Sequence, residues 1–484
     1  MNQTPPAPRH LGLYLVLMLN GFVAAAGLTV IYLMLATLYR EYEGSSGVGW
    51  AVTTYLLVGA ISAALCGRLG DLFGRRFMIL VVLALAGTGS LISAFVPSLV
   101  GVIAGCALQG TAGAMMPLSV GLARETLPQA RVPVAMGVIT CSGMFGAGIA
   151  FLLAGVVLDR YSSHGGFVLK LVLAAMAFVA VSVIVPRPRR PRGSLAGIDM
   201  LRGVLFAPGL GLALVSLELG RKWGFLDIRV LAGFAFAAAL LAYWTYHQAA
   251  EAQPLIDVRM LAQPRIALTN LGWIFLALGP IQLGQTLSLL LQQPTWTGTG
   301  FGFAPSIVGW VMLPLNMLTV VVSPTAGRLG RRFGENRVAL LGASACLCAW
   351  FMMTIWHASF ANVLAAAILC TVGYATLMPA LYSLIAEATP VERASEAAGV
   401  SAVCLAAFMA VGSQMLFGLL GSDRVQDAAH GAAAFPSDKA FTSACIYVVV
   451  MCVCCLGVLL ALRKRVPVAP DSPVPLIAIG ETSR

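Results

Sequence analysis

The chain has 484 residues, of which 59% are apolar and 10% are charged, and its formal net charge is +11. Ordinary soluble domains carry about 25% charged residues, so this composition excludes a water-soluble globular protein. The apolar residues form unbroken runs of about 20 residues, the length that a helix needs to cross a bilayer. They lack the alternation that is typical of membrane β-barrel strands.

Because fourteen such runs follow one another, we predict an all-α integral membrane protein with 14 transmembrane helices. In chain order the predicted spans are 11–38, 48–66, 77–95, 98–123, 133–158, 166–185, 203–219, 228–247, 266–291, 304–325, 338–356, 359–385, 397–420 and 441–462. The span at 203–219 has the weakest apolar pattern. The first run is too long for a cleaved signal peptide and lacks the small-residue cleavage pattern, so we interpret it as a spanning helix.

The basic residues indicate the orientation of the chain. With both termini in the cytoplasm, the cytoplasmic segments hold 22 of the 30 Lys and Arg residues, as expected from the enrichment of basic residues in cytoplasmic loops. Topology beside an anionic lipid leaflet therefore explains the positive net charge. Membrane lipids are expected partners, and nucleic acid is not.

The sequence offers no cluster that is typical of a cofactor site. The 11 cysteines lie almost entirely inside apolar runs, where a thiol behaves as a small hydrophobic group. The Cys-x-Cys-Cys run that begins at Cys452 has no His or acid nearby, so we predict no metal, disulfide, redox or cofactor role. The five histidines are scattered, and no acid pair or activated nucleophile accompanies them, so the sequence does not favour a membrane enzyme.

The chain contains an internal repeat. Residues 67–76 and 327–336 are identical at six of ten positions, and both are predicted to lie on cytoplasmic loops. Each copy follows the second helix of a six-span unit, as internal duplication in transporters predicts. The predicted organisation is a six-helix bundle (1–185), a basic linker with two inserted transmembrane helices (186–265), a second six-helix bundle (266–462) and a cytoplasmic tail (463–484).

Residues 67–76 match the pattern G-x-L-a-D-r-x-G-r-[KR] of the major facilitator superfamily. The span count is similar to that of its fourteen-span drug:proton antiporter branch, and segments 220–224, 254–257 and 309–314 lie where that branch places related segments. The resemblance implies a major-facilitator fold of two six-helix bundles plus two inserted helices. It also implies that the first loop is a gate that latches the two halves on the cytoplasmic side.

The chemistry of the loop motif fits a latch. Two glycines allow a tight turn between the helices, Asp71 can accept hydrogen bonds from a helix N-terminus, and Arg75 and Arg76 can bridge to carboxylates or lipid phosphates. The gating motif comprises Gly67, Arg68, Gly70, Asp71, Gly74, Arg75 and Arg76. Its copy in the second half comprises Gly327, Arg328, Gly330 and Gly334, but there Arg331 replaces the acid.

Three antiporter signatures are degraded. Span 1 lacks the acid of the branch pattern, and residues 150–155 in span 5 lack its proline and two of its three glycines. Cys106 in span 4 replaces the Arg that the family ties to proton coupling. No acid lies in the middle of a predicted span, so we predict an uncharged central pathway. Glu218 is the remaining proton-coupling candidate, and its other interpretation is an exposed helix end beside Arg221 and Lys222.

Neutral polar residues mark the predicted substrate cavity. Four of them lie within about 120 degrees on one face of the ninth span, and because amides facing lipid are costly, this face should meet a cavity or another helix. The cavity candidates are Asn20, Gln109, Met116, Trp273, Gln282, Gln285, Ser288, Gln292 and Tyr374. Hydrogen bonds between helices are the other explanation for the polar members of this set.

The sequence therefore predicts a transporter in a bacterial inner (plasma) membrane that exports small amphipathic organic molecules by alternating access. Proton coupling stays open, because a uniporter or a lipid-like or metabolite carrier without a carboxylate relay fits the missing acid. A non-transporting membrane sensor or scaffold is the alternative from another class.

Overall fold

The computed structural model describes residues 7–42, 46–186, 205–251, 258–259, 263–389, 394–425 and 434–465. Within these ranges the fold is helical, except for one antiparallel pair of two-residue strands, β1 (Arg424–Val425) and β2 (Phe435–Pro436). The helices of the first half are α1 (Ala7–Glu41), α2 (Gly49–Phe73), α3 (Arg75–Phe95), α4 (Leu99–Gly110), α5 (Met115–Thr126) and α6 (Val132–Ile184). Two further helices follow, α8 (Phe206–Trp223) and α9 (Ile228–Ala250).

The second half contains α10 (Pro264–Leu278), α11 (Leu283–Gln292), α12 (Pro305–Phe333), α13 (Glu335–Trp356), α14 (Phe360–Ala388), α15 (Ala394–Leu420) and α16 (Asp438–Arg465). Short 3-10 turns occupy Ser46–Val48, Thr111–Ala114, Gln129–Arg131, Pro280–Gln282 and Thr295–Thr297. The predicted spans at 98–123 and 266–291 are therefore each two helices joined by a 3-10 turn. Pro280, which has no N–H to donate, explains the second interruption.

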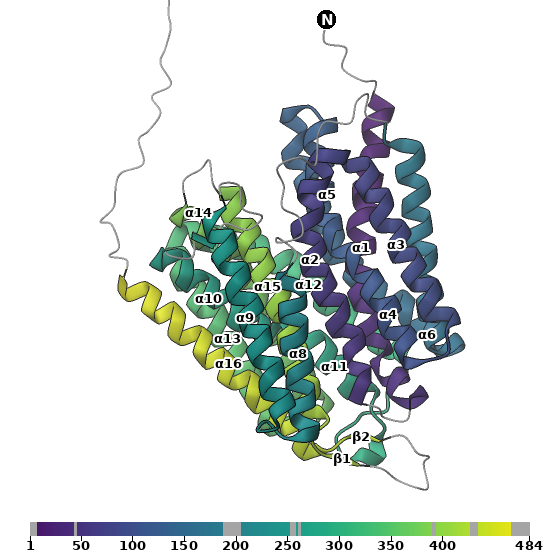
Figure 1. Cartoon of the computed structure of the whole chain (residues 1–484), viewed down its shortest axis with the longest axis vertical. Helices are drawn as coiled ribbons and strands as arrows, with labels where there is room; N and C mark the ends of the chain where they lie inside the picture. Colours follow the sequence, from purple (N-terminus) through teal and green to yellow (C-terminus); the bar gives the residue numbers. More distant parts are fainter. Residues whose placement is uncertain are drawn as a thin grey trace, which may run out of the picture.

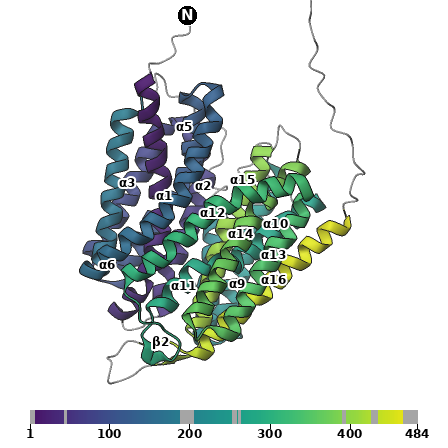
Figure 2. The ribbon, with the colours of Figure 1, turned by 180° about the vertical axis from the view of Figure 1, so that it is seen from behind.

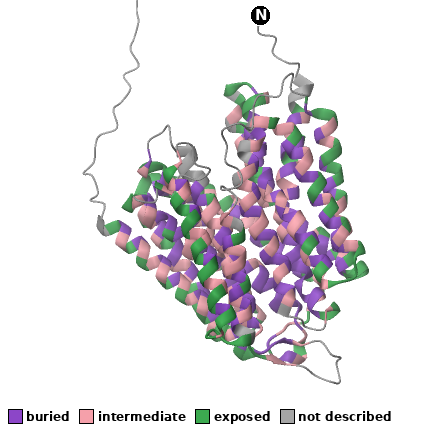
Figure 3. Cartoon of the chain, viewed as in Figure 1, coloured by how far each residue is buried: buried purple, intermediate pink, exposed green. Residues whose placement is uncertain are grey.

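The described residues contain 11 helices that are long and apolar enough to cross a membrane, and two shorter apolar helices at Gly49–Ala63 and Pro208–Gly220. The longest of the 11, Val134–Ile184, loses helical geometry at Tyr161 and Ser162, where φ of Ser162 is 50°. Many large apolar side chains are exposed, and Figure 3 shows exposed residues in green along the outer helices. Such a surface is stable in lipid but not in water, so the chain is a multi-pass membrane protein.

The helices form two bundles that lean together at one end (Figure 1). At that end, a single apolar core contains residues of both halves, including Leu33 of α1, Leu290 of α11 and Phe417 of α15. We call this the shared end. At the opposite end, which carries the Gly74 and Gly334 turns, each half has its own core, one around Ile79 and Leu118 and the other around Val338 and Leu381. We call this the parted end, and Figure 2 shows the same divergence from behind.

The inserted helices pack against each other, and α8 also contacts α2 of the first half and α15 of the second. In Figure 1, α8 and α9 lie across the front of the junction between the bundles. A Cβ atom on Gly211 of α8 would lie 3.4 Å from Leu57 of α2, an ordinary van der Waals distance. The insertion is therefore part of the contact between the halves.

The repeated motif does not lie on loops, and that prediction was wrong. Residues 67–73 form the last two turns of α2, and residues 327–333 end α12 in the same way. Only Gly74 and Gly334 leave the helix, with φ/ψ of 93°/133° and 92°/133°, and the next helix begins at the following residue. Apolar residues within the motif, such as Leu69 and Phe73, continue the helical pattern, so one glycine makes the turn instead of the two expected.

This geometry predicts different effects for two glycines of the same motif copy. We expect Gly334→Ala to lower the free energy of unfolding by about 1–3 kcal/mol, because φ near +92° strains any residue that has a Cβ atom. Gly327→Ala is the matched control, since Gly327 is helical and a Cβ there meets no atom within 4 Å. Apparent melting temperatures in detergent provide the measurement, and an equal shift for both variants would contradict the assignment of the turn to Gly334.

Candidate functional site

The first junction between the halves is a close crossing of α6 and α12 near the shared end. A Cβ atom on Gly155 would come within 2.5 Å of the Pro305 carbonyl oxygen, and one on Gly309 within 2.7 Å of the Phe151 carbonyl oxygen. Asp159 accepts a hydrogen bond from the Ser306 backbone N–H beside this crossing (3.1 Å). Two glycines thus bring the backbones of the halves into contact, as in other membrane helix pairs.

The second junction joins α1 to α11 through Gln292. The side-chain amide of Gln292 donates to the Leu33 carbonyl oxygen of α1 (2.9 Å), and Arg40 of α1 donates to the Gln292 carbonyl oxygen (3.1 Å). Gln292 is buried, so its bond to Leu33 is shielded from water, whereas the bond from Arg40 is part-buried. A predicted cavity residue therefore connects the two halves in this conformation.

The third junction is a buried hydrogen-bonded chain that crosses from the first half to the inserted helices. Thr53 of α2 donates to Gln414 of α15 (3.0 Å), and Gln414 donates to the Glu218 carboxylate of α8 (3.1 Å). The interpretation of Glu218 as an exposed helix end was wrong, because only 7% of this residue is accessible. Sequence reasoning could not find this burial, since it depends on the position of α8 against α15.

The polar face of the ninth span is bound by neighbouring helices. Gln282 donates to the carbonyl oxygens of Ala277 (2.9 Å) and Met409 (3.0 Å), and Gln285 donates to the Gln282 side chain (2.8 Å). The Gln285 amide oxygen accepts from Ser413 of α15 (3.0 Å). These two amides thus fasten the 3-10 turn and α11 to α15, whereas the buried Ser288 hydroxyl has no hydrogen bond within the described residues.

The remaining cavity candidates of the second half and Met116 differ in exposure. Met116 is 55% exposed, whereas Trp273 is fully buried with its ring 4.5 Å from that of Tyr382. Tyr374 is partly buried where the shared core meets the core of the second half. Trp273 therefore lies inside a bundle in this conformation, and Met116 is the candidate whose side chain is accessible.

In the first half, Asn20 and Gln109 are buried and only partly satisfied. Asn20 donates to Ser119 (3.3 Å) and Gln109 donates to Ser93 (3.1 Å), but neither amide oxygen has a partner within the described residues. Gln109 also lines a small cavity of about 20 Å³ between α1, α3, α4 and the second part of α6. A volume of this size holds about one water molecule.

Lys170 lines the same cavity, so a basic residue lies inside the first bundle, and the prediction of an uncharged central pathway, which rested on the acids alone, did not consider it. Lys170 is 6% exposed, and its Nζ lies 5.4 Å from the Tyr55 ring centroid and 5.9 Å from that of Phe167. It also lies within electrostatic range of Cys106. A search restricted to acids missed this residue, although a lysine inside the apolar run 166–185 is visible in the sequence.

The gating motif makes contacts inside the first half in this conformation. Arg75 pairs with Glu125 (3.2 Å), and Arg76 donates to the Ser182 carbonyl oxygen (2.8 Å). In the second half, Glu387 pairs instead with Arg265 (2.9 Å). The side chains of Arg68 and Asp71 lie outside the described part of the structure, so the role expected for Asp71 stays a prediction.

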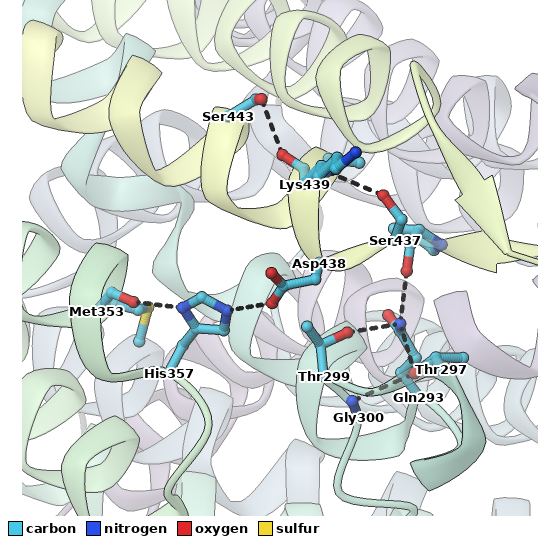
Figure 4. A network of polar contacts seen from close by, with 12 residues as sticks. Gln293, Thr297, Thr299, Gly300, Met353, His357, Ser437, Asp438, Lys439 and Ser443 are labelled. Carbon is cyan, nitrogen blue, oxygen red and sulfur yellow. Dashed lines mark hydrogen bonds and ion pairs between the residues drawn. The ribbon is translucent and has the colours of Figure 1, made fainter.

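A further polar network connects segments of the second half at the shared end (Figure 4). The Gln293 side chain donates to Thr297 (2.9 Å), Thr299 (3.1 Å) and the Pro436 carbonyl oxygen of β2 (2.7 Å). His357, which follows α13, lies 2.8 Å from the Asp438 carboxylate at the start of α16. No group of three His, Cys, Asp or Glu residues that could hold a metal occurs within the described ranges.

Comparison with known proteins places this arrangement in a family. The family model described as Major Facilitator Superfamily matches residues 17–413 and, in a second match, residues 274–477. The multidrug resistance protein Stp of Mycobacterium tuberculosis is 25% identical over 400 residues, which are 81% of this chain and 72% of that protein. The tetracenomycin C resistance and export protein of Streptomyces glaucescens is 26% identical over 411 residues, covering 82% and 73%.

Solved structures show the same fold. A D-xylose–proton symporter superposes with a TM-score of 0.66 at 14% identity and covers 94% of this chain and 98% of its own. An auto-inhibited peptide transporter of the POT family also gives 0.66, at 17% identity, with 96% and 99% covered.

The second junction generates a prediction about local stability. We expect Gln292→Leu to speed amide hydrogen exchange in α11 and in the last turns of α1 about fivefold, because it removes a buried inter-half hydrogen bond of about 1 kcal/mol. Gln129→Leu, at an exposed position outside the junctions, is the control. Hydrogen-exchange mass spectrometry provides the measurement. If the amides of α1 and α11 exchanged at the same rate as in the unaltered protein, Gln292 would not stabilise the contact between the halves.

Proposed function

The chain belongs to the major facilitator superfamily, and we propose that it exports small amphipathic organic molecules by alternating access, in the manner of a multidrug-efflux transporter. The observation that carries this proposal is the division of the core, which is common to both halves at the shared end and separate at the parted end. Such halves can rock about the shared end without unpacking either bundle. The printed names of the two bacterial relatives, which refer to drug resistance and export, support the cargo class.

We place the parted end in the cytoplasm. The Gly74 and Gly334 turns, each flanked by arginines, lie at this end, and cytoplasmic segments collect basic residues. The structure would then represent the conformation that accepts cargo from the cytoplasm. Dividing the 51-residue span at Ser162 and adding the two shorter apolar helices gives the fourteen-span topology with both termini cytoplasmic, and a bacterial inner membrane suits it.

We propose that exposed apolar side chains of the first half meet an amphipathic cargo. Met116 and Phe145 are exposed there, and methionine and aromatic side chains adapt to varied apolar shapes. We propose that Asn20, Gln109 and the amides of the ninth span provide the few polar contacts. Some of these amides would exchange their present partners for cargo as the halves move.

We propose that the gating motif closes the parted end in the opposite conformation. Arg75, now paired with Glu125, and the carboxylate of Asp71 would then face the second half.

Transport could be driven by protons, or it could be uniport without proton coupling. Glu218 is a candidate carboxylate because it is buried and bonded to Gln414, which also binds Thr53 of the other half; a uniporter would use no such group.

Export is testable with ethidium, an amphipathic dye, in everted membrane vesicles from cells that express the chain. We expect vesicles with the protein to accumulate more dye than control vesicles, because cargo enters from the cytoplasmic face. Collapse of the pH gradient separates the two driving forces, since a uniporter would be unaffected by it. The same assay is then repeated with a panel of uncharged and cationic compounds. If no compound accumulated more in vesicles with the protein than in control vesicles, the result would favour a sensor or scaffold.

The crossing of α6 and α12 provides a matched pair of variants for the rocking motion. We expect Gly155→Val to reduce the rate of ethidium transport roughly tenfold, because the added side chain collides with the Pro305 backbone and prevents the close crossing. Gly137→Val, on the same helix with no atom within 4 Å of its Cβ position, should transport at the normal rate. Equal rates in vesicles with equal protein content would show that the crossing is not required for turnover.

A further inference from the structure

Lys170 is an ionisable residue that is buried within a predicted transmembrane span. It belongs neither to the predicted cargo cavity nor to the junctions between the halves. It lies in the second part of α6 and lines the cavity between α1, α3 and α4. Its Nζ makes no hydrogen bond within the described part of the chain. A buried ionisable group inside a membrane bundle is costly to retain, so its presence calls for a function.

Among the described residues, the surroundings of the amine contain no counter-ion. The residues of α1 and α3 at the cavity, such as Gly27 and Ser90, do not titrate, and α2 and α4 present the Tyr55 phenol and the Cys106 thiol. No acidic residue is among the cavity-lining residues of the described chain. The Tyr55 and Phe167 rings offer cation–π contacts, which are weaker than the hydration that an ammonium group loses on burial.

The cavity itself offers a route for a single proton. Its volume of about 20 Å³ admits one water molecule but no organic cargo. Gln109 lines the same space, and its unpartnered amide oxygen could accept a hydrogen bond from that water or from the lysine. The site therefore suits exchange of a proton with water.

We propose that Lys170 is the proton carrier of this transporter, taking the place of an intramembrane carboxylate. In one conformation water reaches the cavity and a proton adds to the neutral amine. In the other conformation the cavity loses this access and meets water of the opposite side, and the ammonium, which has no acidic neighbour at the cavity, gives its proton to that water and becomes neutral again. The proposal rests on the proposed transport function, and it identifies the ion that would be coupled to transport.

The first test measures the amine directly and needs no cargo. The chain has only four lysines, at 170, 222, 439 and 464, so reductive methylation of the full chain in detergent with 13C-formaldehyde gives few NMR signals. The Lys170 signal is the one missing from Lys170→Arg. We expect it to titrate apart from the signal of the exposed Lys439. Titration together with Lys439, a constant shift across the pH range, or failure to react at all would overturn the proposal.

The second test measures coupling in proteoliposomes with ethidium as the probe. We expect a pH gradient to stimulate dye uptake by the unaltered protein, and Lys170→Met and Lys170→Arg to lose this stimulation while retaining dye counterflow. Lys439→Met is the control and should behave as the unaltered protein does. Full stimulation in Lys170→Met would overturn the proposal. Absence of ethidium movement by the unaltered protein would count instead against the proposed function, and the NMR titration would still decide the role of Lys170.

Discussion

Close packing between the two halves at the shared end is the interaction on which the rest of the structure depends. In lipid, helices gain little from hiding apolar surface, so their association relies on close contact and on hydrogen bonds. Gly155 and Gly309 provide the contact between α6 and α12, and Gln292 provides hydrogen bonds between α1 and α11. Because the parted end has a separate core in each half, these junctions can act as the pivot of a transporter.

The buried polar groups divide into two kinds. The amides of Gln282, Gln285 and Gln292 are bonded to neighbouring helices, which compensates for their removal from water. Lys170 and the Gln109 amide oxygen are not bonded in this way within the described ranges. Groups of the first kind hold the conformation, whereas groups of the second kind are available to a proton, a water molecule or a changed arrangement of helices.

The inserted helices belong to the junction between the halves. Glu218 of α8 is bonded to Gln414 of the second half, which is bonded to Thr53 of the first. A rocking motion that separates α2 from α15 therefore also acts on α8. This position gives the insertion a physical link to the transport cycle.

The sequence by itself determined the membrane environment and the helical class, because these follow from apolar run length, and its repeat of ten residues predicted two halves. It also located the turn at each motif copy, although only the structure showed that residues 67–73 are helical and that Gly74 alone leaves the helix. The burial of Glu218, the inter-half bonds of Gln292 and the cavity beside Lys170 were decided by tertiary structure. Each depends on which helix faces which, and hydropathy, which reports only that a segment lies in lipid, contains no information about its neighbours.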